Sequence, residues 1–391
     1  MEIQKSIKNL TDVSLTLTKY ILQTDGKDSN VVCSPISMQV ILSLVAAAAK
    51  GKTLDELLTF LKAKSSEELN SLSSYLIDVV FADGSSSGGP ILSLANGVWI
   101  DKSLSFKSPF KLVVDHVYKA ASDAVDFKNK PNESADLLNS WVEKETHGLI
   151  KDMFPHKLFD NFTWLVYANA IYFKGEWLNP FMASNTKNCN FHLLDGSSIQ
   201  VPFMTKSSAA YQYISAFDSF KVLRLYYKQG DDKQRKFSLN IFLPKEKDGL
   251  PTLVEKLGSE SGFLDKYITS HRERVGEVWI PKFKISFGFE ASKALKGLGL
   301  VSPFSPGEFT ETVNESSEGQ MLFLKNAFHK SFIEVNEEGT EAAAAFGLMI
   351  GGGSSDMLID FVADHPFLFL VREDVTGVVL FTGQVLNPST T

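Results

Sequence analysis

Residues 334–353 read Glu-Val-Asn-Glu-Glu-Gly-Thr-Glu-Ala-Ala-Ala-Ala-Phe-Gly-Leu-Met-Ile-Gly-Gly-Gly, a stretch that suits two secondary structures. The alanine run Ala342–Ala345 favours a helix. The side chains also alternate at strand period, and one face would carry Thr340, Ala342, Ala344, Phe346, Leu348 and Ile350. Gly339 and Gly351–Gly353 give the backbone freedom at both ends. The stretch therefore predicts either an alanine-rich helix with a flexible linker or a segment that can add a strand to a sheet.

The composition predicts a globular protein with a large core, because 44% of the 391 residues are hydrophobic and 12% are aromatic. The formal net charge is −7, and no basic stripe interrupts the sequence. Nucleic acids and anionic membrane surfaces require clustered Lys and Arg, so neither is an expected partner. The longest apolar stretch, Val40–Ala49, is far shorter than the roughly 20 residues that span a bilayer.

The N-terminus mixes charged and apolar residues and does not resemble a secretory signal, which predicts a cytoplasmic or nucleocytoplasmic protein. Cys33 and Cys189 lie far apart without metal-ligand spacing, so we expect two reduced thiols. The sequence contains neither a Gly-x-Ser-x-Gly elbow nor a His-Glu-x-x-His helix. Lys50-Gly-Lys-Thr ends like a phosphate loop, but Ala46 stands where its first glycine belongs. We therefore expect that the protein is not an enzyme and that it binds neither a metal ion nor a cofactor.

The first third of the chain has mainly helical patterns, and the part after residue 164 has mainly strand patterns. Ser34-Pro-Ile-Ser starts one predicted helix, Thr53 would cap another with Glu56 three residues on, and 132–148 has helical spacing. Strands are predicted at 91–100, 164–173, 220–227, 237–243, 277–287, 321–335, 366–371 and 378–385. This order predicts an α+β fold in a single domain, residues 1–391.

Six motifs in order resemble signatures of the serpin family, over nearly the whole chain. They are Asn30-Val-Val-Cys-Ser-Pro-Ile-Ser, Asn169-Ala-Ile-Tyr-Phe-Lys-Gly-Glu-Trp, Ile280-Pro-Lys-Phe, Ala327-Phe-His-Lys, Glu337-Glu-Gly-Thr-Glu-Ala-Ala-Ala-Ala and Asp364-His-Pro-Phe-Leu-Phe. The sequence at 166–177 and 359–369 is most similar to that of the plant intracellular branch of the family. The resemblance implies a helix-rich N-terminal part packed on a large central β-sheet, further sheets, and an exposed reactive-centre loop at 337–358.

The resemblance also implies a monomeric, metastable protease inhibitor. A protease would cut the loop, which would then insert as a new strand of the central sheet and carry the acylated enzyme with it. The implied hinge is Glu337, Glu338, Gly339, Thr340, Glu341, Ala342, Ala343, Ala344 and Ala345. The implied specificity loop is Leu348, Met349, Ile350, Gly351 and Gly352, followed by a reactive bond between Gly353 and Ser354.

Two further groups of residues take roles from the resemblance. Ser34, Ser37, Asn169 and His329 would lie where the sheet opens, with His329 bridging strands by hydrogen bonds. Trp177 and a Lys282–Glu337 pair would lie at the end of the sheet where the loop first inserts.

The loop departs from the family pattern at Phe346, usually a small or hydroxyl residue, and at Gly351–Gly353, where specificity side chains usually stand. These departures predict inefficient inhibition. The alternative is a non-inhibitory serpin that serves as a binding, storage or decoy protein. Such members commonly carry bulky or charged residues in the hinge, whereas residues 339–345 here match the inhibitory pattern.

The target class follows from the residues near the reactive bond. A cut at Gly351–Gly352 would offer Ile350 to a papain-like cysteine protease, the first expected class of target. Serine proteases that prefer small residues come next. No Lys or Arg occurs between Gly339 and Val371, so enzymes that require a basic residue should not recognise the loop.

Overall fold

The computed structural model describes residues 2–206, 211–268, 270–307, 309–314, 322–325, 327–340 and 358–390. Its α-helices are α1 (Glu2–Gln23), α2 (Pro35–Ala48), α3 (Gly51–Phe60), α4 (Ser66–Tyr75), α5 (Ser108–Leu112), α6 (Pro131–Glu145), α7 (Leu250–Ser259), α8 (Phe263–Tyr267) and α9 (Ser292–Gly297). Two π-helical turns, η1 (Leu76–Val80) and η3 (Val113–Val117), extend α4 and α5. Short 3₁₀ turns are η2 (Ser85–Ser87), η4 (Ala183–Asn185) and η5 (Ser302–Phe304). No helix in these residues is long and apolar enough to cross a membrane.

The strands confirm the predicted α+β class. They are β1 (Val31–Cys33), β2 (Ile91–Asp101), β3 (Ala121–Val125), β4 (Leu165–Glu176), β5 (Lys187–His192), β6 (Ser198–Lys206), β7 (Tyr211–Ala216), β8 (Phe220–Tyr226), β9 (Phe237–Pro244), β10 (Glu273–Pro281), β11 (Phe283–Glu290), β12 (Phe328–Val335), β13 (Gly339–Thr340), β14 (Ile359–Val362), β15 (Phe367–Glu373) and β16 (Val379–Val385).

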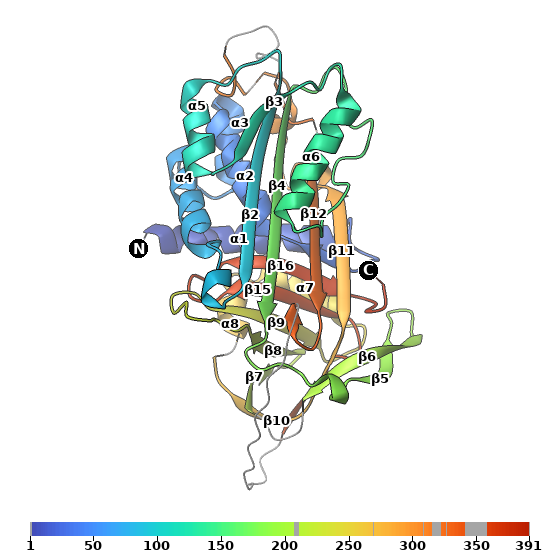
Figure 1. Cartoon of the computed structure of the whole chain (residues 1–391). Coiled ribbons are helices and arrows are strands. Elements are labelled where there is room, and N and C mark those ends of the chain that lie inside the picture. Colours follow the sequence, from blue (N-terminus) through green and yellow to red (C-terminus); the bar gives the residue numbers. More distant parts are fainter. Residues whose placement is uncertain are drawn as a thin grey trace.

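The strands form one long twisted sheet and two smaller ones that stand beside each other. The long sheet has the order β1-β16-β15-β9-β8-β7-β10-β6-β5, with β14 parallel to β10. The second has the order β13-β4-β2-β3, and the third is the pair β11-β12. Figure 1 shows β4 and β12 side by side in the upper half, with β13 between their lower ends. Among the residues described, no hydrogen-bonded ladder joins β4 to β12.

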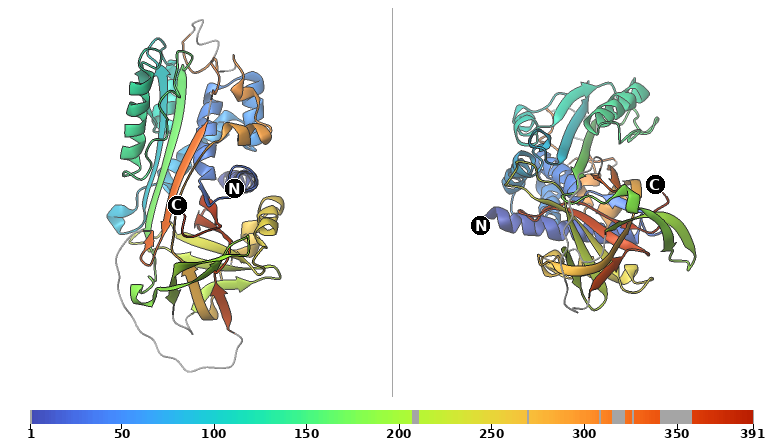
Figure 2. Two further views of the ribbon diagram at one scale, coloured as in Figure 1. Left: turned by 90° about the vertical axis from the view of Figure 1, so that its right-hand side faces the viewer. Right: turned by 60° about the horizontal axis from the view of Figure 1, so that its bottom comes forward.

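Strand β4 is buried on both faces, which explains its nearly continuous apolar sequence. Ile171 and Phe173 belong to the main core, together with α2. Val166, Ala168 and Ala170 belong to a second core beneath α6, with Trp99 and Leu138. Figure 2 shows the strands edge-on, with α6 on one side and α2 on the other. A strand placed next to β4 would therefore also be enclosed on both faces.

Helix α2 begins where the sequence allows one of its first N–H groups to be satisfied. Ser34 caps α2 by accepting a hydrogen bond from the Ser37 backbone N–H, and Pro35 occupies the first helical position. Both features agree with the predicted start of this helix.

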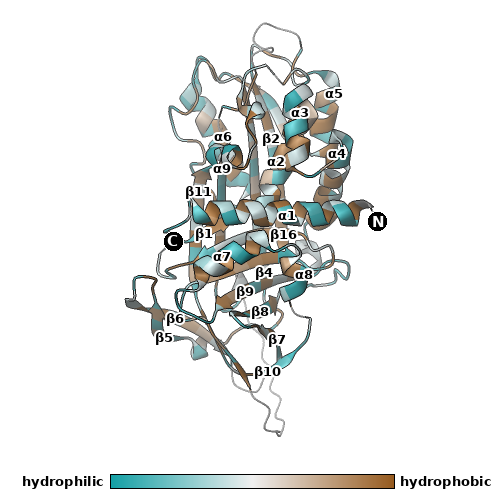
Figure 3. Cartoon of the chain, turned by 180° about the vertical axis from the view of Figure 1, so that it is seen from behind, coloured by the Kyte–Doolittle hydropathy of each residue, from teal (hydrophilic) through white to brown (hydrophobic). Residues whose placement is uncertain are grey.

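Figure 3 shows the back of the molecule, where α1 and α7 lie side by side and carry hydrophilic residues toward solvent.

Several predicted elements were wrong in extent. Thr53 is not a helix cap, because α3 begins at Gly51 and buries Thr53 in its first turn. The Glu56 carboxylate instead accepts hydrogen bonds from the backbone N–H groups of Val301 and Ser302, at 3.0 and 2.7 Å. The predicted strand 277–287 is two strands of different sheets, β10 and β11, which separate at Lys282. The predicted strand 321–335 begins only at Phe328.

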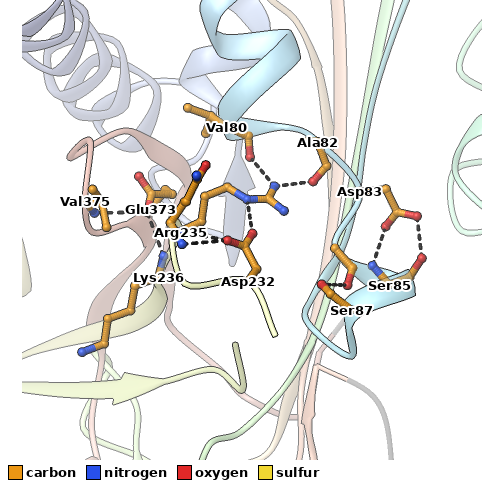
Figure 4. Close-up of polar contacts among 12 residues, drawn as sticks. Val80, Ala82, Asp83, Ser85, Ser87, Asp232, Arg235, Lys236, Glu373 and Val375 are labelled. Carbon is orange, nitrogen blue, oxygen red and sulfur yellow. Dashed lines mark hydrogen bonds and ion pairs between the residues drawn. The ribbon is translucent and has the colours of Figure 1, made fainter. Parts of the chain in front are cut away.

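The glycine-rich loop 83–90 and the loop 229–235, which contains Gly230, are held together at one edge of the sheets. Arg235 is buried, and its guanidinium donates to the Val80 carbonyl at 3.2 Å, to the Ala82 carbonyl and to the Asp232 carboxylate (Figure 4). The Asp231 N–H donates to the Ser87 carbonyl at 2.8 Å. The two backbones approach so closely that a Cβ atom at Gly230 would lie 2.0 Å from that carbonyl oxygen.

We expect Gly230→Ala to lower the melting temperature much more than Gly196→Ala. Both glycines have left-handed φ angles, +64° and +84°, but nothing lies within 4 Å of a Cβ at Gly196. The control substitution should therefore cost only the left-handed strain of about 1–2 kcal/mol. Gly230→Ala adds an overpacking cost of about 1–3 kcal/mol or more. Thermal unfolding of both variants measures the difference, and equal shifts would contradict the close packing of the two loops.

Candidate functional site

A cavity lies between β4 and β12, where the second and third sheets stand apart. Its volume is about 90 Å³. The walls are mostly apolar: Met38, Ile41, Leu42 and Val45 of α2, Leu165 and Val166 of β4, Phe154, Leu158 and Phe159 beneath α6, and Phe328 of β12. Three residues assigned to the sheet-opening region, Ser37, Asn169 and His329, also line it.

His329, on β12, forms its hydrogen bonds with the start of α2 and with its own strand. Its Nε2 accepts from the Ser34 backbone N–H at 3.0 Å and lies 2.8 Å from the Ser331 hydroxyl. An Nε2 that accepts an N–H cannot carry a proton, so the ring is neutral. Burial favours the same form, because it lowers the pKa of His329 to about 4. The predicted bridge therefore joins β12 to α2, and not β12 to β4.

Asn169, on β4, is held by a residue that the sequence analysis did not single out. Asn96 stands directly opposite on β2, and its Oδ1 accepts from the Asn169 Nδ2 at 2.6 Å. The Asn96 Nδ2 in turn donates to the Tyr118 carbonyl at 3.0 Å. The Asn169 Oδ1 is buried, and no donor among the described residues reaches it. A polar residue in the middle of the strand pattern 91–100 was the signal that could have identified Asn96.

The second group of predicted site residues lies where β4 and β12 end together. The Lys282 Nζ is 2.8 Å from a Glu337 carboxylate oxygen, and the Thr186 hydroxyl donates to the other oxygen at 2.7 Å. Burial opposes ionisation of Glu337, but these two hydrogen bonds hold its pKa below the usual range. Glu337 is 9% exposed, so this pair is more than a surface contact.

Trp177 fastens the segment that follows β12 to the end of β4. Its backbone N–H donates to the Glu338 carbonyl and its indole N–H to the Asn336 carbonyl, both at 2.9 Å. The indole also stacks on Tyr227, with ring centroids 4.6 Å apart. Trp177 and Lys282 thus both contact the segment 336–338, where β4 and β12 end.

The first hinge residues form a short strand beside β4. Gly339 pairs with Glu176, and Thr340 pairs with Gly175, in an antiparallel ladder. Gly339 has φ +142°, and a Cβ there would lie 2.2 Å from the Gly175 carbonyl oxygen. Only glycine fits this position. The remaining hinge residues 341–345, the specificity loop 348–352 and the reactive bond Gly353–Ser354 lie outside the described residues.

The described residues contain no group of three or more His, Cys, Asp or Glu suited to a metal ion. Cys33 and Cys189 are both free thiols. Cys33 is buried against hydroxyl groups of Thr382 and Thr18, and this burial raises its pKa to about 11.

We expect His329 to make the native state sensitive to acid. The unfolded chain takes up a proton near pH 6.5, whereas the folded state resists protonation until about pH 4. The free energy of unfolding should therefore fall as the pH drops through this window, by roughly 3 kcal/mol at its lower end. Melting temperatures between pH 7 and 4 measure the effect. His329→Gln cannot take up this proton, so a variant with an unchanged pH profile would contradict the assignment.

Comparison with known proteins identifies the family. Residues 8–388 match the model of the family described as Serpin (serine protease inhibitor). Serpin-ZX of Arabidopsis thaliana is 51% identical over 392 residues, covering 99% of this chain and 100% of that protein. Serpin-ZXA of Oryza sativa subsp. japonica is 50% identical, covering 99% and 98%. The solved structure of Arabidopsis AtSerpin1 in its native stressed conformation matches with a TM-score of 0.91 at 50% identity, covering 100% of both chains. The chain therefore belongs to the serpin family, as its motifs predict.

Proposed function

We propose that this serpin is a suicide-substrate protease inhibitor. A serine or papain-like cysteine protease would cleave the loop 337–358, and the freed segment would insert between β4 and β12. The observation that carries the proposal is β13, which already pairs with the last residues of β4 beside the gap between β4 and β12. The competing function, a non-inhibitory binding, storage or decoy serpin, gives no reason for this pairing.

The register of β13 specifies where each loop residue would go. In an antiparallel pair, each step forward along the loop moves one residue back along β4. Continuing from Thr340 opposite Gly175, Ala342 comes opposite Phe173, Phe346 opposite Asn169 and Ile350 opposite Leu165. Ile350 would thus reach the first residue of β4, so the alternating segment and the strand match in length.

The same register assigns each side of the inserted strand to one of the two cores. Cross-strand partners share a face, so the even-numbered loop residues would point toward the main core, as Phe173 and Ile171 do. Phe346 would reach the cavity beside Asn169. Its bulk, which the family pattern lacks, therefore has a space in which to be buried.

A protease panel tests the proposed function. We expect a complex that survives a denaturing gel with a papain-like cysteine protease or with a serine protease that prefers small residues. The released C-terminal peptide, read by mass spectrometry, should start at Gly352, Gly353 or Ser354. The nicked protein should melt well above the intact one, because the new ladder adds about 0.5–1.5 kcal/mol per hydrogen bond. Cleavage without a complex or a gain in stability would favour the non-inhibitory function.

Paired substitutions test the inserted register. Ala342→Arg places a guanidinium opposite the buried Phe173, so insertion should fail and the protease should cleave the chain without being trapped. Glu341→Arg changes the neighbouring residue, which comes opposite the half-exposed Lys174, and should keep most of the trapping. The ratio of complex to cleaved product measures both. Equal losses in the two variants would refute the assignment of faces.

A further inference from the structure

A hollow beside the loop-insertion end is lined by three cations and three tyrosines, and its lining includes no acidic residue from the described part of the chain. We name it the tyrosine–cation hollow and define it by Lys206, Tyr211, Tyr213, Arg224, Tyr226 and Arg272. These residues come from β6, β7, β8 and the residue before β10, strands that Figure 1 shows together at the lower end of the molecule. The chain as a whole has a net charge of −7, so this surface is a local exception.

One of the three cations is already neutralised within the protein. The Arg224 Nη2 is 2.6 Å from the Asp374 carboxylate, and its Nε donates to the Ser238 hydroxyl at 3.2 Å. The guanidinium lies 4.6 Å from the centre of the Tyr226 ring. Arg224 therefore supports the wall of the hollow without contributing surplus charge.

No carboxylate of the described residues pairs with the other two cations. The Lys206 Nζ donates to the Asn179 carbonyl at 2.8 Å and lies 4.4 Å from the centre of the Phe181 ring. An ammonium has three N–H donors, and this carbonyl uses one. The Arg272 guanidinium lies 4.8 Å from the centre of the Tyr213 ring. Within the described ranges neither residue forms an ion pair, so the hollow holds two surplus positive charges.

We propose that the tyrosine–cation hollow binds a phosphate monoester. A monoester carries about −1.5 to −2 charge near pH 7, which matches the two surplus cations better than a carboxylate does. The tyrosine hydroxyls add neutral donors at the walls. Tyr211, 60% exposed, offers a ring against which a flat organic group can pack. This proposal is independent of protease inhibition, since the ligand binds before any cleavage.

The affinities of small probe molecules, measured by calorimetry, test whether the hollow selects a doubly charged group and whether its aromatic wall contributes to binding. Phenyl phosphate should bind about tenfold or more tightly than the singly charged phenyl sulfate, and more tightly than inorganic phosphate. A phosphotyrosyl peptide distinguishes the source of the ligand: tighter binding than phenyl phosphate indicates a modified protein, and equal binding indicates a free small molecule. No binding of phenyl phosphate at millimolar concentration, or equal binding of phenyl sulfate, would overturn the proposal.

Substitutions locate the binding. Lys206→Gln and Arg272→Gln should each lower the affinity for phenyl phosphate by about tenfold. Lys296→Gln is the matched control, because this lysine also lies on an aromatic ring, 4.7 Å from the centre of Phe304, but belongs to α9 outside the hollow. Unchanged affinity in folded Lys206 and Arg272 variants would overturn the assignment.

The pH dependence of the wild-type protein gives a test that needs no variant to fold. Burial lowers the pKa of Lys206 to about 8, so the affinity should fall as the pH rises from 7 to 9 and this ammonium loses its proton. The phosphate charge hardly changes over this range, because its second pKa is about 6. Burial raises the pKa of Tyr226 to about 12, so its hydroxyl stays neutral. Lys206→Arg should retain affinity at pH 9, and a flat wild-type profile would count against the proposal.

Discussion

The rest of the structure is arranged around a gap between β4 and β12. Among the residues described, no hydrogen-bonded ladder joins these two strands. Both strands are surrounded by well-packed neighbours, and β4 pairs with β2 over ten residues. Because no strand hydrogen bonds cross this gap, other contacts must fix the positions of the strands on its two sides. The hydrogen bonds of His329 and the contacts of residues 336–340 do so at two places along the gap.

The two places differ in their physical character. In the middle, a neutral His329 receives an N–H from Ser34, a contact that carries no net charge and needs a dry environment. At the end, an ion pair between Lys282 and Glu337 combines with Trp177 to fix the backbone that leads out of β12. Such a partly buried ion pair is a weak source of net stability, but it fixes position, because Glu337 without Lys282 would be a costly buried charge. The first hinge residues need this fixed position in order to pair with the end of β4.

The sequence predicted the buried strands well and the exposed ones poorly. β4, β8, β9, β15 and β16 are almost entirely buried and rich in apolar residues, and their patterns were recognised. β5 is mostly exposed at the edge of the long sheet, so it has no apolar run by which a pattern search could find it. Likewise, the motifs brought Trp177, Lys282 and Glu337 together correctly. The partner of Asn169 is a single residue on another strand, and no local spacing encodes such a pair.

The unpaired oxygen of Asn169 connects the geometry of the gap with the proposed insertion. Within the described ranges this buried acceptor has no donor, and an unmade hydrogen bond of this kind costs about 1–3 kcal/mol. The apolar residues around it cannot relieve that penalty, because they have no donors. A new strand beside β4 would bring backbone N–H groups into the same space and would fill the cavity with the Phe346 ring. The polar and the apolar parts of the cavity would thus both gain from one added strand.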